Sequence, residues 1–320
     1  FFQAEDGIRD SVASRGLGDV YKRQNMISDV ESVRYTIGIL HPGAMGISVA
    51  ESLIAAGNEV MWCSDGRSPE SKERARTVAD LVDTGWLNGL VNRSKLIISV
   101  VPPVAALDVA FEVSSLGYRG LYLDANAISP ETARLVAREV ESSGAQYIDG
   151  GIIGPPATKA GNTRLYISGD GANTVSDRLN GGLLETIALE GDATAASSLK
   201  MAYAGWSKGS AALLAGIITL AESNGVFEHL AKEWDLSQPM LNARSDALGP
   251  SVAKAWRFAG EMEEIAKTFA EAGLPNGFHL AAAELYQQLE TYKDNSNAPG
   301  GKKLALALQE IISNSRKNMK

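Results

Sequence analysis

From residue 34 onward, short apolar runs alternate with segments in which apolar residues recur every three or four positions. The short runs are rich in β-branched residues and predict buried strands, whereas the longer period predicts helices. Strands are expected over 34–40, 58–64, 94–101, 120–126, 145–152, 163–169 and 186–191, and helices over 44–57, 69–81, 130–144 and from Pro103 to about Gly117. This repetition of β-α units predicts an α/β fold, a doubly wound parallel sheet with helices on both faces.

After Gly191 the pattern becomes helical throughout. A long, mostly apolar run from 193 to 226 carries small residues that allow close helix packing, and further helices extend to about Ser315 with Pro and Gly breaks near 249–250, 273–277 and 299–301. We therefore expect an α/β domain over 34–192 and an all-α domain over 193–315. The long helix is apolar on more than one face, which predicts a homodimer that buries it.

The first residues are a separate case. Residues 1–24 have no initiator Met and no sustained apolar core, so they do not resemble a signal peptide. They resemble translated adapter sequence of the kind found at the ends of genes from environmental sequencing, and Met26 is then a candidate start. The alternative is a native disordered arm. We expect residues 1–25 to lie outside the fold in either case.

Composition limits the classes of function. The 320 residues are 45% hydrophobic and 21% charged, which is ordinary for a globular protein, and the net charge is −8. A negative balance argues against a general nucleic-acid or anionic-membrane partner. The single cysteine, Cys63, rules out an internal disulfide and is typical of a reducing, cytoplasmic compartment. The longest apolar run is too short to span a membrane.

The stretch GILHPGAMG, residues 38–46, lies between the first expected strand and the first expected helix. Its glycines nearly fit the G-x-G-x-x-G fingerprint of dinucleotide-binding, Rossmann-type folds, except that His41 replaces the first loop glycine. Amides at the helix start would face a pyrophosphate. We expect His41 to take a negative φ and to lie near the phosphates or the nicotinamide. The expected cofactor contacts here are Gly38, His41, Pro42, Gly43, Ala44, Met45 and Gly46.

The end of the second strand indicates which dinucleotide binds. An NAD site usually places an acidic residue there to bind the ribose 2′-hydroxyl, and Asp65 is a candidate. Ser64, Arg67 and Ser68 instead offer donors for a 2′-phosphate, with Arg67 able to bind it through two hydrogen bonds. We therefore expect NADP, with NAD as the alternative, and we expect no metal.

These motifs together resemble the β-hydroxyacid dehydrogenase superfamily, which includes 3-hydroxyisobutyrate and 6-phosphogluconate dehydrogenases. The resemblance covers residues 34 to about 295 and rests on GILHPGAMG, SVVPP, LDANAISP, DGGIIGPPA and SLKMAYAGWSKG. It is greatest for a branch whose C-terminal domain is a phosphogluconate-dehydrogenase-type domain of unknown function. It implies an NAD(P)H-dependent oxidoreductase acting on a small molecule in a cleft between two domains.

The resemblance also implies roles for single residues. Lys200 matches the catalytic lysine of the superfamily, and its apolar helical surroundings should lower its pKa, as a general acid/base requires. The alternative for Lys200 is an extended side chain at the surface of a packed helix. Asn126 matches a substrate-binding position, while Val101 and Pro102 match the loop beside the nicotinamide.

The chain departs from the superfamily at three places. Ala204 replaces an asparagine, and the neighbouring Tyr203 is a candidate for its role. The second substrate loop contains Ile153-Gly154-Pro155 in place of Ser-Gly-Gly, and a later Lys-Asp pair is replaced by acidic residues, namely Glu261, Glu263 and Glu264. These changes suggest a neutral or cationic substrate group.

Three functions therefore remain open. The first is a carbonyl/alcohol oxidoreductase with Lys200 as general acid/base. The second is an imine reductase or reductive aminase, because DGGIIGPP resembles the corresponding imine reductase loop, although those enzymes usually have Asp or Tyr where Lys200 stands. The third is an NADP-binding protein without catalysis, which would not need Lys200.

Overall fold

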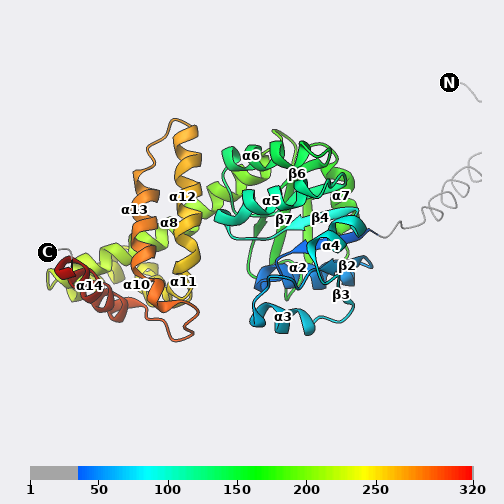
Figure 1. The fold of residues 1–320 in the computed structure, drawn as a ribbon. Coiled ribbons are helices and arrows are strands. Elements are labelled where there is room, and N and C mark those ends of the chain that lie inside the picture. Colours follow the sequence, from blue (N-terminus) through cyan, green and yellow to red (C-terminus); the bar gives the residue numbers. More distant parts are fainter. Residues whose placement is uncertain (1–34, 319–320) are drawn as a thin grey trace, which may run out of the picture. The chain divides into compact units, whose positions relative to one another are not determined.

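The computed structural model describes residues 35–318, and the expectations for residues 1–25 lie outside this range. One sheet of eight strands has the order β3-β2-β1-β4-β5-β6-β7-β8 (Figure 1). Neighbouring strands are parallel except β6 and β7, which are antiparallel. The strands are β1 (Thr36–Leu40), β2 (Glu59–Trp62), β3 (Leu81–Asp83), β4 (Leu96–Ser99), β5 (Leu121–Asp124), β6 (Gln146–Ile153), β7 (Thr163–Ser168) and β8 (Leu184–Ala188). The expected doubly wound α/β fold is confirmed, with one antiparallel pair in the sheet.

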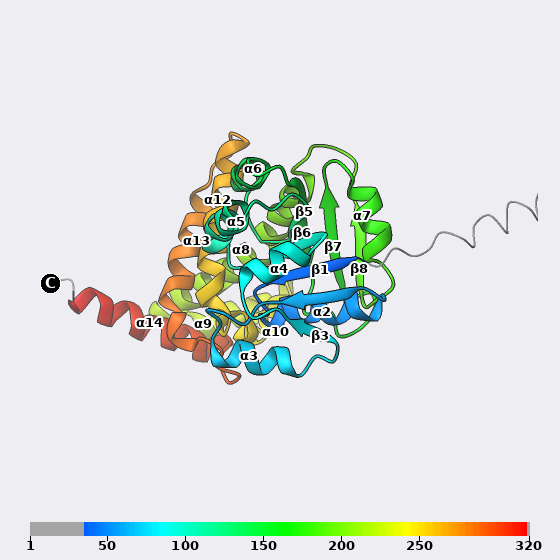
Figure 2. The same ribbon diagram turned by 45° about the vertical axis from the view of Figure 1, so that its right-hand side comes forward.

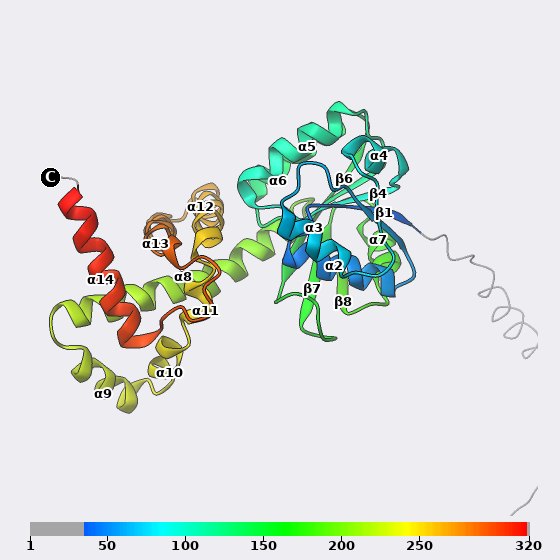
Figure 3. The same ribbon diagram turned by 60° about the horizontal axis from the view of Figure 1, so that its bottom comes forward.

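Helices cover both faces of the sheet because successive strand residues point to opposite sides. Ile37 and Ile39 pack into a core with α2 (Ala44–Ala55) and α7 (Ala172–Leu179). Leu40 and Ile97 pack on the opposite face with α4 (Leu87–Arg93), α5 (Ala106–Ser115) and α6 (Pro130–Glu141). Figure 3 shows α4, α5 and α6 on one side of the sheet and α2 and α7 on the other. The strands are therefore buried on both faces, as their continuous apolar runs predict.

The segment after β2 differs from the expectation of one helix over 69–81. Helix α3 (Pro69–Arg76) ends early: the Thr77 hydroxyl donates to the Arg74 carbonyl at 2.8 Å, and Asp80 adopts a φ of 62°. The chain then forms the edge strand β3 and the short helix α4. Strand β3 has only three residues, Leu-Val-Asp, which is too short to show a strand pattern in the sequence.

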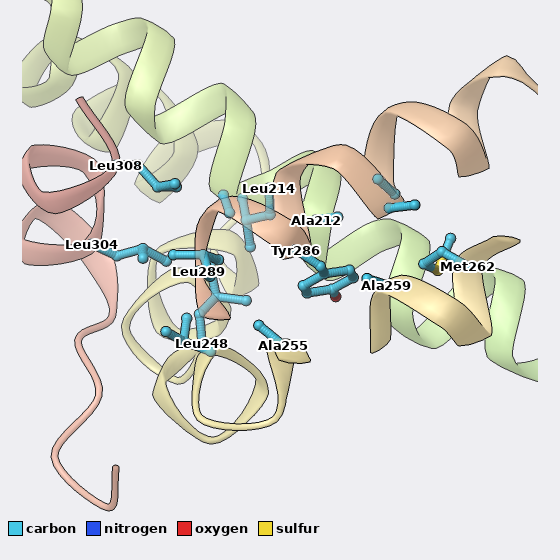
Figure 4. Close-up of a cluster of buried hydrophobic side chains, with 14 of the residues drawn as sticks. Ala212, Leu214, Leu248, Ala255, Ala259, Met262, Tyr286, Leu289, Leu304 and Leu308 are labelled. Atoms are coloured by element: carbon cyan, nitrogen blue, oxygen red, sulfur yellow. The ribbon is translucent and has the colours of Figure 1, made fainter. Parts of the chain in front are cut away.

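The helical part surrounds the long helix α8 (Ala195–Ser223), close to the expected 193–226. The remaining helices are α9 (Phe227–Ser237), α10 (Met240–Asp246), α11 (Gly249–Val252), α12 (Ala255–Glu271), α13 (Gly277–Gln288) and α14 (Gly301–Asn318), with 3-10 turns at Pro103–Ala105 (η1) and Glu290–Tyr292 (η2). Helices α12 and α13 lie side by side (Figure 2). Their core contains Met262, Tyr286 and Leu304 (Figure 4). None of the helices between residues 35 and 318 is long and apolar enough to cross a bilayer.

Two contacts fix the start of α8 against the sheet. Gly151 in β6 approaches the helix so closely that a Cβ there would lie 2.9 Å from the Ala196 carbonyl and from Lys200 Cβ. Asp149, two residues earlier in β6, accepts hydrogen bonds from the Ser197 amide at 2.7 Å and the Ser197 hydroxyl at 2.6 Å. The first turns of α8, which carry Lys200, are thereby held over the end of β6.

Candidate functional site

The loop between β1 and α2 has the form of a dinucleotide turn. His41 adopts a φ of 72°, in the left-handed region that usually favours glycine, so the expected negative φ is wrong. The fingerprint has glycine here for this conformation, which histidine adopts more readily than most side chains do. Gly46 is also constrained, because a Cβ there would lie 2.5 Å from the His41 carbonyl oxygen. The loop therefore keeps the fold of the fingerprint although its first glycine is absent.

The N-terminus of α2 is open to a ligand. Gly43 is the N-cap residue, and a Cβ there would meet only the His41 ring, at 3.7 Å. The amides that follow, at Ala44, Met45 and Gly46, have no acceptor within the helix, as at any helix start. Gly38 differs from these residues: it is buried in β1, and a Cβ there would clash with Leu90 of α4 at 2.5 Å. We assign Gly38 to helix packing and not to the expected cofactor contact.

The turn after β2 lies beside the glycine loop. Arg67 Nη1 lies 3.0 Å from His41 Nδ1, so the two expected cofactor residues are in direct contact. Ser68 is the N-cap of α3, where its hydroxyl accepts from the Ser71 amide at 3.2 Å. Ser64 is half-buried, and its amide donates to Asp83 at 3.1 Å, whereas Asp65 is exposed. Both the 2′-phosphate candidates and the competing Asp65 thus lie on one short turn.

This corner of the site carries positive charge. Arg74 on α3 donates to the Pro42 carbonyl at 3.3 Å, which brings a second guanidinium to the loop. Burial lowers the pKa of His41, and Arg67 and Arg74 lower it further. Arg67 Nε is buried without a hydrogen-bond partner. An open helix N-terminus beside an incompletely bonded guanidinium fits the phosphates of a nicotinamide dinucleotide.

The loop after β4 is tied to the loop after β5 by a buried asparagine. Asn126 is 2% exposed, accepts from the Val101 amide at 2.6 Å and donates to Ser99 Oγ at 3.0 Å. Each end of its side-chain amide thus has one protein partner, and the expected contact with substrate stays a prediction. Asn126 fixes the Val101-Pro102 segment, in which Val101 is buried and Pro102 is exposed.

Lys200 lies above the end of β6. Its Nζ donates to the Ile152 carbonyl at 2.6 Å, and burial lowers its pKa to about 8, with a further lowering by Lys208. The carboxyl ends of β1, β4, β5 and β6 meet at one edge of the sheet, because these strands are parallel neighbours. The glycine loop, the Val101 segment and Lys200 are therefore located at this same edge.

Three charged residues act on Lys200, of which Lys208 and Arg257 were not expected from the sequence. Lys208, two turns further along α8, forms an ion pair with Glu261 of α12, and both side chains are nearly buried. Burial raises the pKa of Glu261, but Lys208 and Lys200 outweigh this effect, and the net pKa lies below its ordinary value. Arg257, also on α12, is exposed and acts on Lys200 as a third positive charge. The cluster therefore holds three cations and one carboxylate.

The other two residues of the acidic run lie elsewhere. Glu264 is buried and accepts from the Ser129 amide at 2.8 Å and the Thr132 hydroxyl at 2.7 Å, so it joins α12 to the start of α6. Glu263 is exposed beside a hollow between α6 and α12. Glu261 is thus the one member of the run that lies near Lys200, and it is already paired with Lys208.

Two further expectations concern Tyr203 and the second substrate loop. Tyr203 is 52% exposed and Ala204 is buried, so the two side chains differ in their surroundings, and the role expected for Tyr203 stays a prediction. In the loop, Gly154 has a φ of 123°, and the Pro155 carbonyl accepts from Thr163 at 2.6 Å. These contacts hold the hairpin between β6 and β7 closed.

Two family profiles match the chain. Residues 36–189 match the NAD binding domain of 6-phosphogluconate dehydrogenase, and residues 221–289 match a domain of unknown function, DUF1932. The first covers the sheet with the glycine loop, and the second lies within the helical part. Both agree with the resemblance drawn from the sequence motifs.

Three known proteins are similar to this chain. An uncharacterised 28.5 kDa protein in the 7S RNA 5′ region of Methanothermus fervidus is 30% identical over 173 residues, which is 54% of this chain and 65% of that protein. A conserved protein of unknown function, described as structurally similar to 3-hydroxyacid dehydrogenases, is 28% identical, with a TM-score of 0.59 over 80% of this chain and 97% of its own. The 3-hydroxyisobutyrate dehydrogenase of Mycobacterium tuberculosis shares the fold at 17% identity, with a TM-score of 0.61 over 87% and 99% of the two chains.

Proposed function

The chain belongs to the β-hydroxyacid dehydrogenase superfamily, and we propose that it is an NADP(H)-dependent oxidoreductase acting on a carbonyl or alcohol carbon. The observation that carries this proposal is Lys200, a lysine with a pKa of about 8 at the sheet edge where the glycine loop also ends. When bound, the nicotinamide supplies or accepts the hydride. The residues named above would hold its phosphates.

In this proposal Lys200 moves the proton that accompanies the hydride. The Ile152 carbonyl orients the ammonium through a 2.6 Å hydrogen bond and leaves its other two protons free for a substrate oxygen. During reduction Lys200 donates a proton to the nascent alkoxide. In the reverse direction neutral Lys200 accepts the alcohol proton. A pKa near 8 suits both directions close to neutral pH.

The charges around Lys200 support an anionic substrate. Lys208 neutralises Glu261, so the acidic run does not supply the free carboxylate that a cationic substrate would need. Arg257 remains an exposed guanidinium close to Lys200 and forms no ion pair within residues 35–318. Arginine binds carboxylates through two hydrogen bonds. We therefore propose an oxo or hydroxy acid as substrate, in place of the neutral or cationic group expected from the sequence.

A substrate panel tests this proposal. Oxo acids, neutral aldehydes and cyclic imines should each be offered with NADPH and with NADH, while nicotinamide absorbance is recorded. We expect oxo acids with NADPH to react fastest. Faster turnover of cyclic imines would favour the imine reductase alternative. Tight NADPH binding without turnover of any compound would favour a binding protein without catalysis.

We further propose that Arg67 selects NADPH. Arg67 lies on a shallow hollow of about 690 Å³ beside α3, whose charged lining also includes Lys72, Arg74 and Arg76 together with Glu70 and Glu73. Arg67→Ala should weaken NADPH binding by about 2 kcal/mol, since a hydrogen bond to a charged group is lost, and should barely change NADH binding. Fluorescence titration of both cofactors gives the comparison. Arg93→Ala, which removes an exposed arginine on α4, is the matched control. Equal losses for NADPH and NADH in Arg67→Ala would contradict the assignment.

We also propose a homodimer that covers α8. One side of this helix exposes an apolar stripe at helical spacing, namely Tyr203, Trp206, Leu213, Ile217 and Leu220, of which Trp206 is 72% exposed. Large apolar side chains exposed along one side of a helix can mark an association surface. Light scattering at micromolar concentration should give about twice the 33.9 kDa of one chain, and Trp206→Glu should give a monomer. A monomeric parent protein would contradict this proposal.

A further inference from the structure

The contact between His41 and Arg67 has a consequence for protonation. A guanidinium has only donors, so Arg67 Nη1 at 3.0 Å from His41 Nδ1 requires an unprotonated nitrogen that accepts. The imidazole paired with Arg67 is therefore neutral and carries its proton on Nε2. A protonated His41 would have no lone pair for this bond, and the two positive charges would repel each other.

The surroundings of His41 favour the neutral ring in the free protein. Within residues 35–318, the charged groups that face it are two guanidiniums, Arg67 from the turn after β2 and Arg74 from α3. Burial of the ring acts in the same direction and lowers its pKa. His41 also stands in a glycine conformation, with a φ of 72°, which directs its side chain toward this turn. The ring thus occupies the space between the phosphate loop and the 2′-phosphate candidates.

Arg67 is only partly bonded in this arrangement, because its Nε is buried without a partner. A phosphate dianion offers three strong acceptor oxygens and can bind both edges of a guanidinium, which a single imidazole nitrogen cannot do. The same dinucleotide would bring pyrophosphate oxygens to the start of α2, beside His41. The Arg67 guanidinium would then leave His41 Nδ1, and the phosphate oxygens of the cofactor would become the charged neighbours of the ring.

We propose that His41 couples cofactor binding to proton uptake: the neutral ring holds Arg67 in the free protein, releases it to the 2′-phosphate of NADPH, and binds a proton in the complex. This inference rests on the proposed function, because it takes NADPH as the ligand. It assigns His41 a role in cofactor affinity and selectivity that a glycine at this position would not have.

Calorimetric titration of the full chain with NADPH tests the coupling. Measurements at pH 7.5 in two buffers of different ionisation enthalpy give the number of protons bound per cofactor, and the 2′-phosphate is already dianionic at this pH. We expect net uptake in the parent protein. The Kd should rise by up to about tenfold per pH unit from pH 7 to 8. NADH should give less uptake because it leaves Arg67 on His41.

His41→Gly is the decisive variant. Its loop should keep the observed conformation, since glycine adopts a φ of 72° without strain. We expect it to bind NADPH without proton uptake and with a Kd that varies less than about twofold from pH 7 to 8. His229→Gln, which removes an exposed histidine on α9, should keep the parent uptake.

Binding of NADPH by the parent protein without proton uptake would overturn the inference, and so would equal uptake by His41→Gly. Both results would leave the proposed oxidoreductase intact. A parent protein that binds no NADPH at any pH would instead overturn the proposed function, and the inference with it.

Discussion

Replacing Lys200 by methionine is expected to lower kcat for carbonyl reduction by roughly 10²–10⁴-fold, the usual contribution of a positioned general acid. Methionine keeps the length and the apolar stem of the side chain but has no proton to donate. The Kd for NADPH should hardly change, because the glycine loop follows β1 whereas Lys200 lies on α8. Steady-state kinetics on an oxo acid, together with a cofactor titration, separate these two effects.

The pH profile should identify Lys200 as the proton donor. Its pKa is lowered to about 8, so the ammonium that reduction requires is lost as pH rises through about 8. Reduction should therefore slow above this pH, and alcohol oxidation, which needs the neutral amine, should accelerate over the same range. Lys200→Met should abolish both dependences.

Lys208→Met provides a matched control on the same helix. It removes a positive charge that lowers the pKa of Lys200 and leaves the Glu261 carboxylate, which raises it, without its ion-pair partner. The alkaline limb of the reduction profile should consequently move to higher pH. If Lys200→Met reduces oxo acids as fast as the parent, Lys200 is a packing residue. If that variant loses carbonyl reduction but keeps imine reduction, the imine reductase alternative gains support.

The sequence predicted the sheet because its strands are buried on both faces. Runs such as IGIL and LIIS contain little else than β-branched and aliphatic residues, and each is followed by a segment with helical spacing. Ser68-Pro69 and Ser129-Pro130 begin helices where expected. Strand β3 was not predicted, because it lies at the sheet edge, where Leu81 and Val82 are only half-buried.

Conformation and side-chain direction within the site were harder to predict. The residue type at position 41 favoured a negative φ, whereas the fingerprint, which has glycine at this position, was the signal for the left-handed conformation. Asn126 was expected to contact substrate, and the sequence did not show that its amide also binds Ser99 of β4 and Val101 in the loop that follows. A single sequence contains the residue types of such contacts but not the strand order that brings them together.

The charges around Lys200 depend on tertiary contacts in the same way. Glu261 follows Lys208 by 53 positions, and their pairing requires α12 to pack along α8. The available sequence signal was the spacing of Lys200 and Lys208, two turns apart on one apolar helix. This spacing places the two lysines near each other along α8, but it does not show that Lys208 pairs with Glu261.

A second large effect is expected from the carboxyl groups beneath the site. Asp124 and Asp149 are paired residues on the neighbouring strands β5 and β6, and both are fully buried. Burial raises the pKa of Asp124 to about 8, and one of its oxygens has no hydrogen-bond partner. Burial also raises the pKa of Asp149, to about 6, although its bonds to Ser197 oppose the shift.

Raised carboxyl pKa values make the folded state bind more protons than the unfolded state between about pH 4 and pH 8. The free energy of unfolding should therefore fall as pH rises across this window. One pKa unit corresponds to about 1.4 kcal/mol. Urea unfolding at pH 5 and pH 8 should show the folded protein less stable at pH 8, and Asp124 should account for most of the loss above pH 6.

Asp124→Asn should accordingly stabilise the protein at pH 8, on the order of 2–4 kcal/mol, with little change at pH 5. The asparagine side chain resembles the protonated carboxyl in shape, and its oxygen can still accept from the Asn126 backbone amide at 2.9 Å.

Asp149→Asn should instead destabilise the protein at pH 8. The ionised carboxylate accepts both Ser197 donors at the start of α8, and an amide can satisfy only part of them. Loss of these bonds should also reduce activity, since α8 carries Lys200. Equal destabilisation of both variants at pH 8 would instead mean that Asp124 is ionised and hydrogen-bonded in the folded protein, which would overturn this prediction.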